Sequence, residues 1–344
     1  MSPRRFLLLA GLVACGARPF TPQTVVDNVR VLSSRTDLPY AQPGESVNVD
    51  LLVADGRPDQ SRAVTVGWLP FLCVNPAADL YYACFAPQAQ VVPSTGTLAE
   101  PAPAPGSGAA PTGPIDLARL VGTDITDFLV KGDRFSFVMP EAIVPHENNA
   151  TDYGVVFLFN IACAGRVRIA APDPEGGQEQ MPLECVDESG TKLPASEYTV
   201  GFTRVYSYRE RRNANPVISR ILYQGQPVDL ATGITMPACT ESKRLDCDTV
   251  ELDVDSPAES QEPKLGETLL TGEVPREQVY AQYYSTTGLF TQDARLLYDS
   301  ATGLVTDRAA EMIPPATPGL GRIYVVVKDD RGGTSWVDFP LRTE

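Results

Sequence analysis

Residues 45–54 read ESVNVDLLVA, and this stretch decides the fold class of the chain. Its apolar side chains recur at every second position from Val47 to Val53, so they share one side of an extended backbone. The pattern predicts a β-strand with one buried face. Residues 63–68 (AVTVGW) and 133–139 (DRFSFVM) repeat the same alternation.

Other strands are predicted at short intervals along the rest of the chain. Residues 153–163, YGVVFLFNIAC, are apolar on both faces, which is typical of a central strand covered on each side. Further strands are expected at 198–208, 217–223, 249–255 and 278–284, and residues 321–341 read as two strands around a glycine turn. No long helical repeat lies between them. The expected class is therefore an all-β sandwich fold.

Length and composition divide the chain into two sandwiches. Residues 28–210 are expected to form the first and residues 217–344 the second, with a polar, basic linker at 211–216 between them. A proline-rich stretch at 87–114 cannot pack a core, and it is expected to be an inserted loop of the first sandwich. Residues 115–130 fit either a short helix or an irregular strand.

The first 27 residues have the features of a lipoprotein start. Arg4 and Arg5 precede an apolar run of nine residues, whereas a membrane-spanning helix needs about 20, so residues 1–14 are expected to be an export signal. The sequence LVAC then places a small residue before Cys15, as in a bacterial lipobox. We expect cleavage before Cys15, acylation of its thiol and amine, and a lipidated tether over 15–27.

The cysteines support this interpretation. The sequence has seven cysteines. If Cys15 carries the lipid, six remain, an even number suited to disulfides in an oxidising compartment. They fall into three local couples: Cys73 with Cys84, Cys163 with Cys185, and Cys239 with Cys247. Local pairing is expected. A zinc site is not, because there is no C-x-x-C spacing and the sequence has a single histidine.

The charge of the chain excludes some partners. It has 28 basic and 43 acidic residues, a net charge of −15 that becomes −17 when Arg4 and Arg5 leave with the signal. Nucleic acid is not an expected partner, because its binding demands a basic surface. The expected membrane contact is the N-terminal lipid, and the expected location is the outer membrane, since Gly16 stands where an aspartate would favour inner-membrane retention.

Three stretches resemble a known family. Residues 27–56, 211–227 and 321–336 read DNVRVLSSRTDLPYAQPGESVNVDLLVADG, RRNANPVISRILYQGQP and GRIYVVVKDDRGGTSW. They are similar to predicted surface lipoproteins of myxobacteria with tandem immunoglobulin-like or PKD-like domains. The resemblance implies an envelope location and two sandwiches but no activity. Unlike in antibody domains, strand 45–54 has no cysteine to meet Cys163.

Candidate chemistry is sparse. His146, in the polar segment VPHENNATD, would need a nucleophile and an orienting carboxylate to act in a hydrolase, and no G-x-S-x-G segment exists. Ser189 and Lys192 match S-x-x-K without its companion motifs, so we interpret the match as chance. Five acidic residues could bind calcium or form the solvent-exposed face of a strand: Asp246, Asp248, Glu251, Asp253 and Asp255.

Two aromatic groups could contact a ligand. Tyr280 and Tyr284 lie on one face of a predicted strand and are candidates for stacking on sugars. A basic and aromatic cluster is either a docking surface or an ordinary linker: Arg204, Tyr206, Tyr208, Arg209, Arg211 and Arg212. The expected function is a non-enzymatic lipoprotein without a cofactor, acting in adhesion or as an envelope scaffold with a protein or polysaccharide partner. The alternative is a carbohydrate-binding module.

Overall fold

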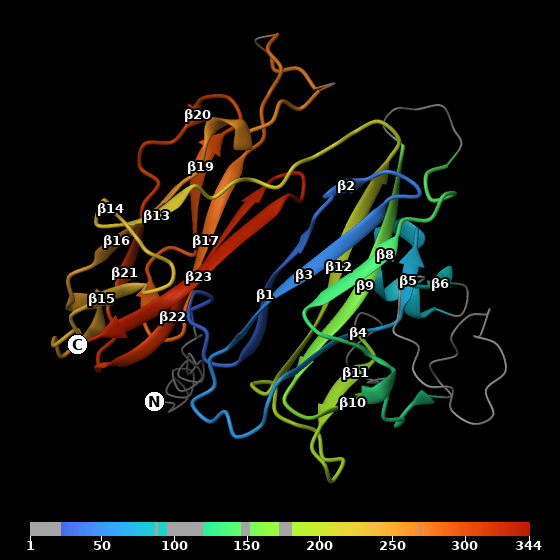
Figure 1. Cartoon of the computed structure of the whole chain (residues 1–344), viewed down its shortest axis with the longest axis horizontal. Coiled ribbons are helices and arrows are strands. Elements are labelled where there is room, and N and C mark those ends of the chain that lie inside the picture. Colours follow the sequence, from blue (N-terminus) through green and yellow to red (C-terminus); the bar gives the residue numbers. More distant parts are fainter. Residues whose placement is uncertain are drawn as a thin grey trace, which may run out of the picture.

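The computed structural model describes residues 22–86, 89–94, 120–145, 152–171, 181–265, 267–270 and 272–344. Within these ranges the chain is built from strands, and its helices are short 3₁₀ segments: η1 (Ala77–Asp79), η2 (Tyr81–Phe85), η4 (Thr126–Phe128), η5 (Arg244–Asp246) and η6 (Ala258–Ser260). Two sandwiches lie side by side in Figure 1, with strands β1–β12 in the first and β13–β23 in the second. The expected all-β class is confirmed.

The first sandwich has a three-stranded sheet and a seven-stranded sheet. The smaller sheet has the order β1 (Val29–Thr36), β3 (Ser46–Asp55), β8 (Arg134–Val138). The larger has the order β2 (Tyr40–Ala41), β12 (Tyr198–Tyr208), β9 (Tyr153–Cys163), β4 (Thr65–Trp68), β7 (Val130–Lys131), with β5 (Phe71–Val74) beside β9 and β6 (Val91–Pro93) beside β5. A hairpin of β10 (Arg166–Ile169) and β11 (Leu183–Val186) forms a separate two-stranded sheet.

The alternation of apolar residues fixes how these layers pack. Val47 and Val49 of β3 and Phe135 and Phe137 of β8 face one side of the larger sheet, where they meet Trp68 and are at most 2% exposed. The strands predicted at 45–54 and 133–139 are confirmed with their buried faces.

Strand β9 is buried on both faces, as its doubly apolar sequence predicted. Val156 and Leu158 face the smaller sheet, whereas Phe157 and Phe159 face a second apolar layer that includes Val167 of the β10–β11 hairpin. The Cys163–Cys185 disulfide joins the end of β9 to β11, and the Cys73–Cys84 disulfide joins β5 to η2. Both bridges therefore hold this outer layer on the central sheet.

The second sandwich pairs a five-stranded with a six-stranded sheet. The first has the order β14 (Gln226–Pro227), β13 (Arg220–Tyr223), β16 (Val250–Asp255), β21 (Ala310–Ile313), β18 (Leu289–Phe290). The second has the order β15 (Ile234–Met236), β23 (Thr334–Thr343), β22 (Gly319–Asp329), β17 (Val279–Ser285), β19 (Ala294–Asp299), β20 (Gly303–Leu304). The third disulfide, Cys239–Cys247, lies beside Ile313 of β21.

The predicted hairpin at 321–341 is confirmed as β22 and β23. Gly332 in its turn has φ +100°, a conformation that L side chains rarely adopt. Ile323, Val325 and Val327 point into the core of the second sandwich, whereas Tyr324 and Val326 point outward. This outer face of β22 is also buried, because the first sandwich covers it.

The covering contact is an apolar cluster that we call the interdomain seam. It joins side chains of both sandwiches: Val26, Leu32, Leu52, Ala54, Tyr284, Tyr324 and Val326, with Trp336 at its margin. All but Trp336 are at most 9% exposed. A fully buried large apolar side chain contributes about 1.5–3 kcal/mol. Arg35 adds a cation–π contact, 4.4 Å from its guanidinium carbon to the Trp336 ring centre.

The N-terminal segment 22–27 closes the seam. The Val26 N–H donates to the Ser285 carbonyl over 2.9 Å, and the Ser285 N–H donates to the Thr24 carbonyl over 2.9 Å. Val26 is fully buried, and a Cβ on Gly56 would come within 1.9 Å of its carbonyl oxygen. Of the tether predicted at 15–27, residues 15–21 lie outside the described residues, and residues 22–27 pack against both sandwiches.

The linker is also fixed to both sandwiches. The Asn215 amide donates to the Thr36 carbonyl of β1 over 2.7 Å and accepts the Thr334 N–H of β23 over 2.8 Å. Arg212 forms a two-pronged ion pair with Glu45, at 2.6 and 2.7 Å. One side chain, Asn215, thus bridges the two sandwiches.

Two uncertain segments of the first sandwich are partly described. Of the expected insert at 87–114, residues 89–94 are described, and 91–93 form β6 rather than a solvated loop; the remainder lies outside the described residues. Of 115–130, only 120–130 are described, where the chain forms the short η4 and then enters β7. Residues 120–130 therefore contain both a short helix and a short strand, which the sequence had offered as alternatives.

The disulfides should differ in their contribution to stability. We expect Cys163→Ala with Cys185→Ala to lower the free energy of unfolding by about 3 kcal/mol, because the bridge closes a span of 22 residues. Removing Cys239–Cys247, which spans 8 residues, should cost less. Urea unfolding of both double variants checks the order. A larger loss for the second pair would contradict it.

Asn215 should couple the unfolding of the two sandwiches. We expect Asn215→Ala to lower the stability by about 1–3 kcal/mol, because the Thr334 N–H and the Thr36 carbonyl lose their partner. Differential scanning calorimetry should then resolve two transitions where the parent shows one. The control is Asn48→Ala, which removes exposed hydrogen bonds with Asp37 and Ser136 within the first sandwich and should keep one transition. A single transition in Asn215→Ala as well would show that the bridge is dispensable.

Candidate functional site

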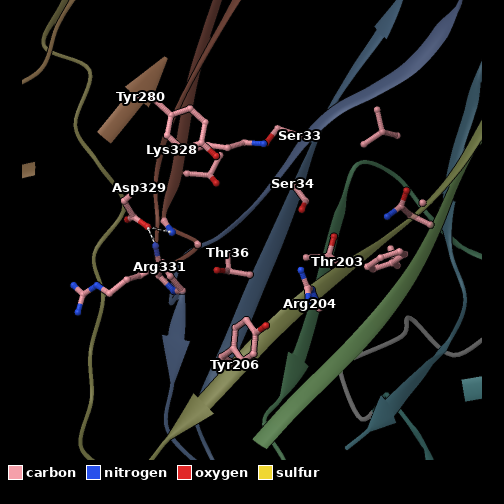
Figure 2. Close-up of a pocket in the computed structure, with 18 of the residues that line it drawn as sticks. Ser33, Ser34, Thr36, Thr203, Arg204, Tyr206, Tyr280, Lys328, Asp329 and Arg331 are labelled. Carbon is pink, nitrogen blue, oxygen red and sulfur yellow. Dashed lines mark hydrogen bonds between the residues drawn. The ribbon is translucent and has the colours of Figure 1, made fainter. Parts of the chain in front are cut away.

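A cleft with a volume of 440 Å³ lies where the first sandwich meets the β22–β23 turn (Figure 2). It is lined by β1 and β12 on one side and by β17, β22 and the turn on the other. It is open because both lining strands of the first sandwich are sheet edges here. β1 ends its sheet, and β12 pairs with β2 only at Tyr206 and Ser207.

Three buried polar side chains line this cleft. Ser33 of β1, Asn160 of β9 and Thr203 of β12 are 7%, 2% and 5% exposed. Ser33 Oγ, Asn160 Oδ1 and Thr203 Oγ1 are buried and have no hydrogen-bond partner among the residues that the structure describes. Since a buried polar atom without a partner costs about 1–3 kcal/mol, a molecule that enters and hydrogen-bonds to them is stabilised.

Two cations of the cleft are unpaired. Lys328 of β22 is half-buried and Arg204 of β12 is exposed, and neither makes an ion pair or hydrogen bond with a residue that the structure describes. In Figure 2 the Lys328 side chain extends from β22 toward Ser33. Burial lowers the pKa of Lys328, because the ammonium leaves water without gaining a counter-charge. An anion in the cleft would supply that charge.

The two tyrosines proposed from the sequence as sugar contacts differ in exposure and surroundings. Tyr280 is half-buried and lines the cleft, so its ring is available to a ligand. Tyr284 lies on the same face of β17 but is 9% exposed within the interdomain seam, with the Arg30 guanidinium 5.6 Å from its ring centre. The hypothesis that both tyrosines stack on a sugar is therefore wrong for Tyr284.

The wall formed by the β22–β23 turn is held by Arg331. Its guanidinium donates to Glu277, to Glu262 over 2.7 Å and to Asn213 of the linker over 2.7 Å. Asp329 accepts the backbone N–H groups of Arg331 and Gly333, each over 2.8 Å. This network joins the cleft wall to the linker.

Burial within the network raises the pKa of two carboxyl groups, those of Glu277 and Asp329. Glu277 is fully buried, and burial together with the neighbouring Asp329 charge raises the pKa of Glu277 to about 7. Burial also raises the pKa of Asp329, partly offset by the hydrogen bonds that it accepts. Arg331 of the turn thus contacts a carboxyl group, that of Glu277 just before β17, whose pKa lies near neutral pH.

The basic and aromatic cluster is divided between two roles. Arg204 and Tyr206 line the cleft. Arg209 donates to the Val144 carbonyl over 2.9 Å, the Arg211 guanidinium lies 5.6 Å from the Tyr208 ring centre, and Arg212 pairs with Glu45. Arg211 and Arg212 therefore position the linker, Arg209 is held within the first sandwich, and Arg204 lines the cleft.

The acidic residues of β16 are held by arginines. Arg308 pairs with Asp253 at 3.1 Å and Arg220 with Asp255 at 2.8 Å, while Glu251 is exposed. No group of three or more His, Cys, Asp or Glu among the described residues is placed to hold a metal ion. Ser189 bonds to Asp187 over 2.6 Å in a turn, and Lys192 lies 3.9 Å from Glu184.

Cys15 and His146 lie outside the described residues. The other six cysteines form the same three local pairs that were expected from the sequence. Across the described part of the chain, none of the helices has the length and apolar character needed to span a membrane.

Sequence reasoning missed most of the cleft. Ser33, Thr203 and Lys328 carry no pattern of their own, because they sit among ordinary strand residues. Asn160 did carry a signal. It is the one amide within the apolar run YGVVFLFNIAC, and a polar side chain buried in a central strand is uncommon unless it has a partner.

Comparisons with known proteins give no family. No family model and no curated protein matches the chain. Among solved structures, it is similar to latent PorU from Porphyromonas gingivalis, with 11% identity over 93% of this chain and 24% of that one, at a TM-score of 0.20. It is also similar to Escherichia coli alpha-2-macroglobulin, with 10% identity over 94% of this chain and 22% of that one, at a TM-score of 0.21.

A third similarity is to domains 4 and 5 of the S-layer protein SbsC, with 9% identity over 91% of this chain and 98% of that one, at a TM-score of 0.16. The chain thus spans 24% of the first of these proteins and 22% of the second. At these TM-scores the similarities support no statement about function.

The buried Glu277 should make stability depend on pH. Because its folded pKa of about 7 lies above the ordinary value of 4.5, its contribution is fully present below about pH 4.5 and is lost as the pH rises through 7. We expect Glu277→Gln to flatten this fall in the urea midpoint between pH 5 and 7.5. Glu259→Gln, an exposed position, should leave the slope unchanged. Equal slopes in parent and Glu277→Gln would rule the assignment out.

Proposed function

We propose that this protein is a non-enzymatic lipoprotein of the outer membrane that presents two sandwiches as one body, in adhesion or as a scaffold in an envelope complex. The observation that carries the proposal is the interdomain seam. Separate domains on a flexible linker would need no such contact. Here an apolar cluster, the 22–27 segment and the bridging Asn215 hold the sandwiches in one arrangement.

The position of the seam sets the geometry of the proposed anchor. The chain enters the described structure at Pro22, next to the contact of Thr24 and Val26 with Ser285 of the second sandwich. Pro22 follows Cys15 by seven positions, and a stretch of that length spans at most about 25 Å. A lipid on Cys15 would thus hold the seam, and both sandwiches with it, near the membrane.

The disulfides and the acidic composition of the chain also support the proposal. Six cysteines in three disulfides suit an oxidising compartment outside the cytoplasm. The acidic chain favours solubility and disfavours nucleic acid or direct adsorption to an anionic lipid surface. The resemblance to surface lipoproteins of myxobacteria agrees with an envelope location and stays a hypothesis.

The anchor is tested by changing the proposed lipidation site. We expect Cys15→Ala to move the protein from the detergent phase to the aqueous phase in detergent phase separation, because the acyl chains have no attachment point. Mass spectrometry of the N-terminal peptide should show a diacylglyceryl group and an amide-linked acyl chain on Cys15 of the parent.

The matched control is Gly16→Ala, which changes the neighbouring residue and keeps the thiol. It should stay in the detergent phase. An unmodified N-terminal peptide in the parent, or a Cys15→Ala protein that partitions like the parent, would overturn the lipoprotein proposal.

A further inference from the structure

We infer that the cleft between the sandwiches binds a carboxylated saccharide, of the kind found as a uronic acid unit in acidic polysaccharides. This goes beyond the proposed function, because a lipid-anchored scaffold requires no small-molecule site. The inference rests on the residues that the interdomain contact brings to one place: two unpaired cations, three buried polar atoms without partners in the described structure, and two aromatic rings.

The cations select an anion. Lys328 and Arg204 approach the cleft from different sandwiches, and within the described structure neither has a carboxylate partner. This is unusual for the protein, in which many other arginines pair with acidic residues, such as Arg308 with Asp253 and Arg322 with Asp338. The one carboxylate in the cleft lining, Asp329, already accepts hydrogen bonds from the Arg331 and Gly333 N–H groups and from the Asn213 amide, and it forms no ion pair with either cation.

The three buried polar side chains of the cleft favour a ligand that carries hydroxyl groups. Ser33 and Thr203 each offer a hydroxyl that donates and accepts, and Asn160 Oδ1 offers an acceptor. Gly201 lies opposite Asn160 on β12, so no side chain there covers the Asn160 amide. A simple carboxylate would satisfy the cations but could not donate to Asn160 Oδ1. A sugar supplies hydroxyl donors and acceptors on the same ring as its carboxylate.

The aromatic rings and the size of the cleft fit a sugar ring. Tyr280 and Tyr206 line the cleft from opposite sandwiches and offer apolar faces to the C–H groups of a sugar. The volume of 440 Å³ lies within the roughly 300–1,000 Å³ of small-molecule sites. It is large for a few structural waters, each of which takes about 30 Å³ of liquid volume.

A second cleft of the molecule shows the contrast. It has a volume of 660 Å³ and lies between β3, β4 and the β22–β23 strands. Its arginines are already neutralised, because Arg35 and Arg134 both pair with Asp50, and Arg322 pairs with Asp338. The larger cleft therefore lacks the unpaired arginine that distinguishes the smaller one.

Calorimetric titration of the full-length protein with trigalacturonic acid tests the inference. We expect saturable binding with a Kd below about 1 mM, and no binding of the fully methyl-esterified trimer, which keeps the hydroxyls and loses the charge. Lys328→Met should weaken binding about tenfold, because a charge-assisted hydrogen bond is lost. Lys192→Met removes an exposed ammonium elsewhere and should bind like the parent.

Thr203→Val separates a ligand role from a structural one. The change keeps the shape of the side chain and removes a hydroxyl that has no partner in the described structure, so the thermal midpoint should stay level or rise. Binding should nevertheless weaken about threefold, because a hydrogen bond to the sugar is lost. If Lys328→Met fails to fold, Arg204→Gln, at an exposed position, tests the charge instead and should also weaken binding.

Several outcomes would overturn the inference. These are no binding of trigalacturonic acid at millimolar concentration, equal binding of its methyl ester, unchanged affinity in both Lys328→Met and Thr203→Val, or tighter binding of a glutamate trimer, which would indicate an acidic peptide. The titration can be repeated on the Cys15→Ala protein. Because Cys15→Ala changes none of the residues that line the cleft, failure of the anchor and failure of the cleft are separate results.

Discussion

The burial of the outer face of β22 is the constraint on which the arrangement of this protein depends. Residues 323–327 are apolar or aromatic at every position, so one face of the strand fills the core of the second sandwich and the other must find a second partner. The first sandwich provides it through Leu52 and Ala54 of β3 and Leu32 of β1. Two sandwiches that could have been separate units become one body, because water would otherwise meet this outer face.

The cleft is a consequence of the same contact. Once β1 packs beside β22, the open side of the first sandwich faces the β22–β23 turn, and residues from β1, β9, β12, β17 and β22 surround one space. Buried polar atoms without partners reduce stability, as does a half-buried ammonium without a counter-charge. Sites that bind ligands commonly keep such groups, because a core optimised for stability alone would fill or pair them.

Much of the local structure could be predicted from sequence. The alternation in 45–54 and 133–139, the doubly apolar run at 153–163 and the glycine turn near Gly332 each identified an element correctly. The cleft could not be predicted, because its residues come from distant parts of the chain, from Ser33 to Lys328 and beyond. Of its members, the sequence analysis named Arg204, Tyr206 and Tyr280 as candidate ligand contacts, and the amide of Asn160 within an apolar run is a further signal.

By itself the sequence determined the strands, their buried faces, the pairing of neighbouring cysteines and the expectation of a lipidated start. Those features depend on side-chain period and short spacing, which a linear pattern records. Only the tertiary structure decided that residues 22–27 pack between the sandwiches, that Tyr284 is buried while Tyr280 is accessible, and that Asn215 bridges two sheets. Periodicity tells which side of a strand avoids water, but the partner that covers it is chosen by shape and contact across the whole chain.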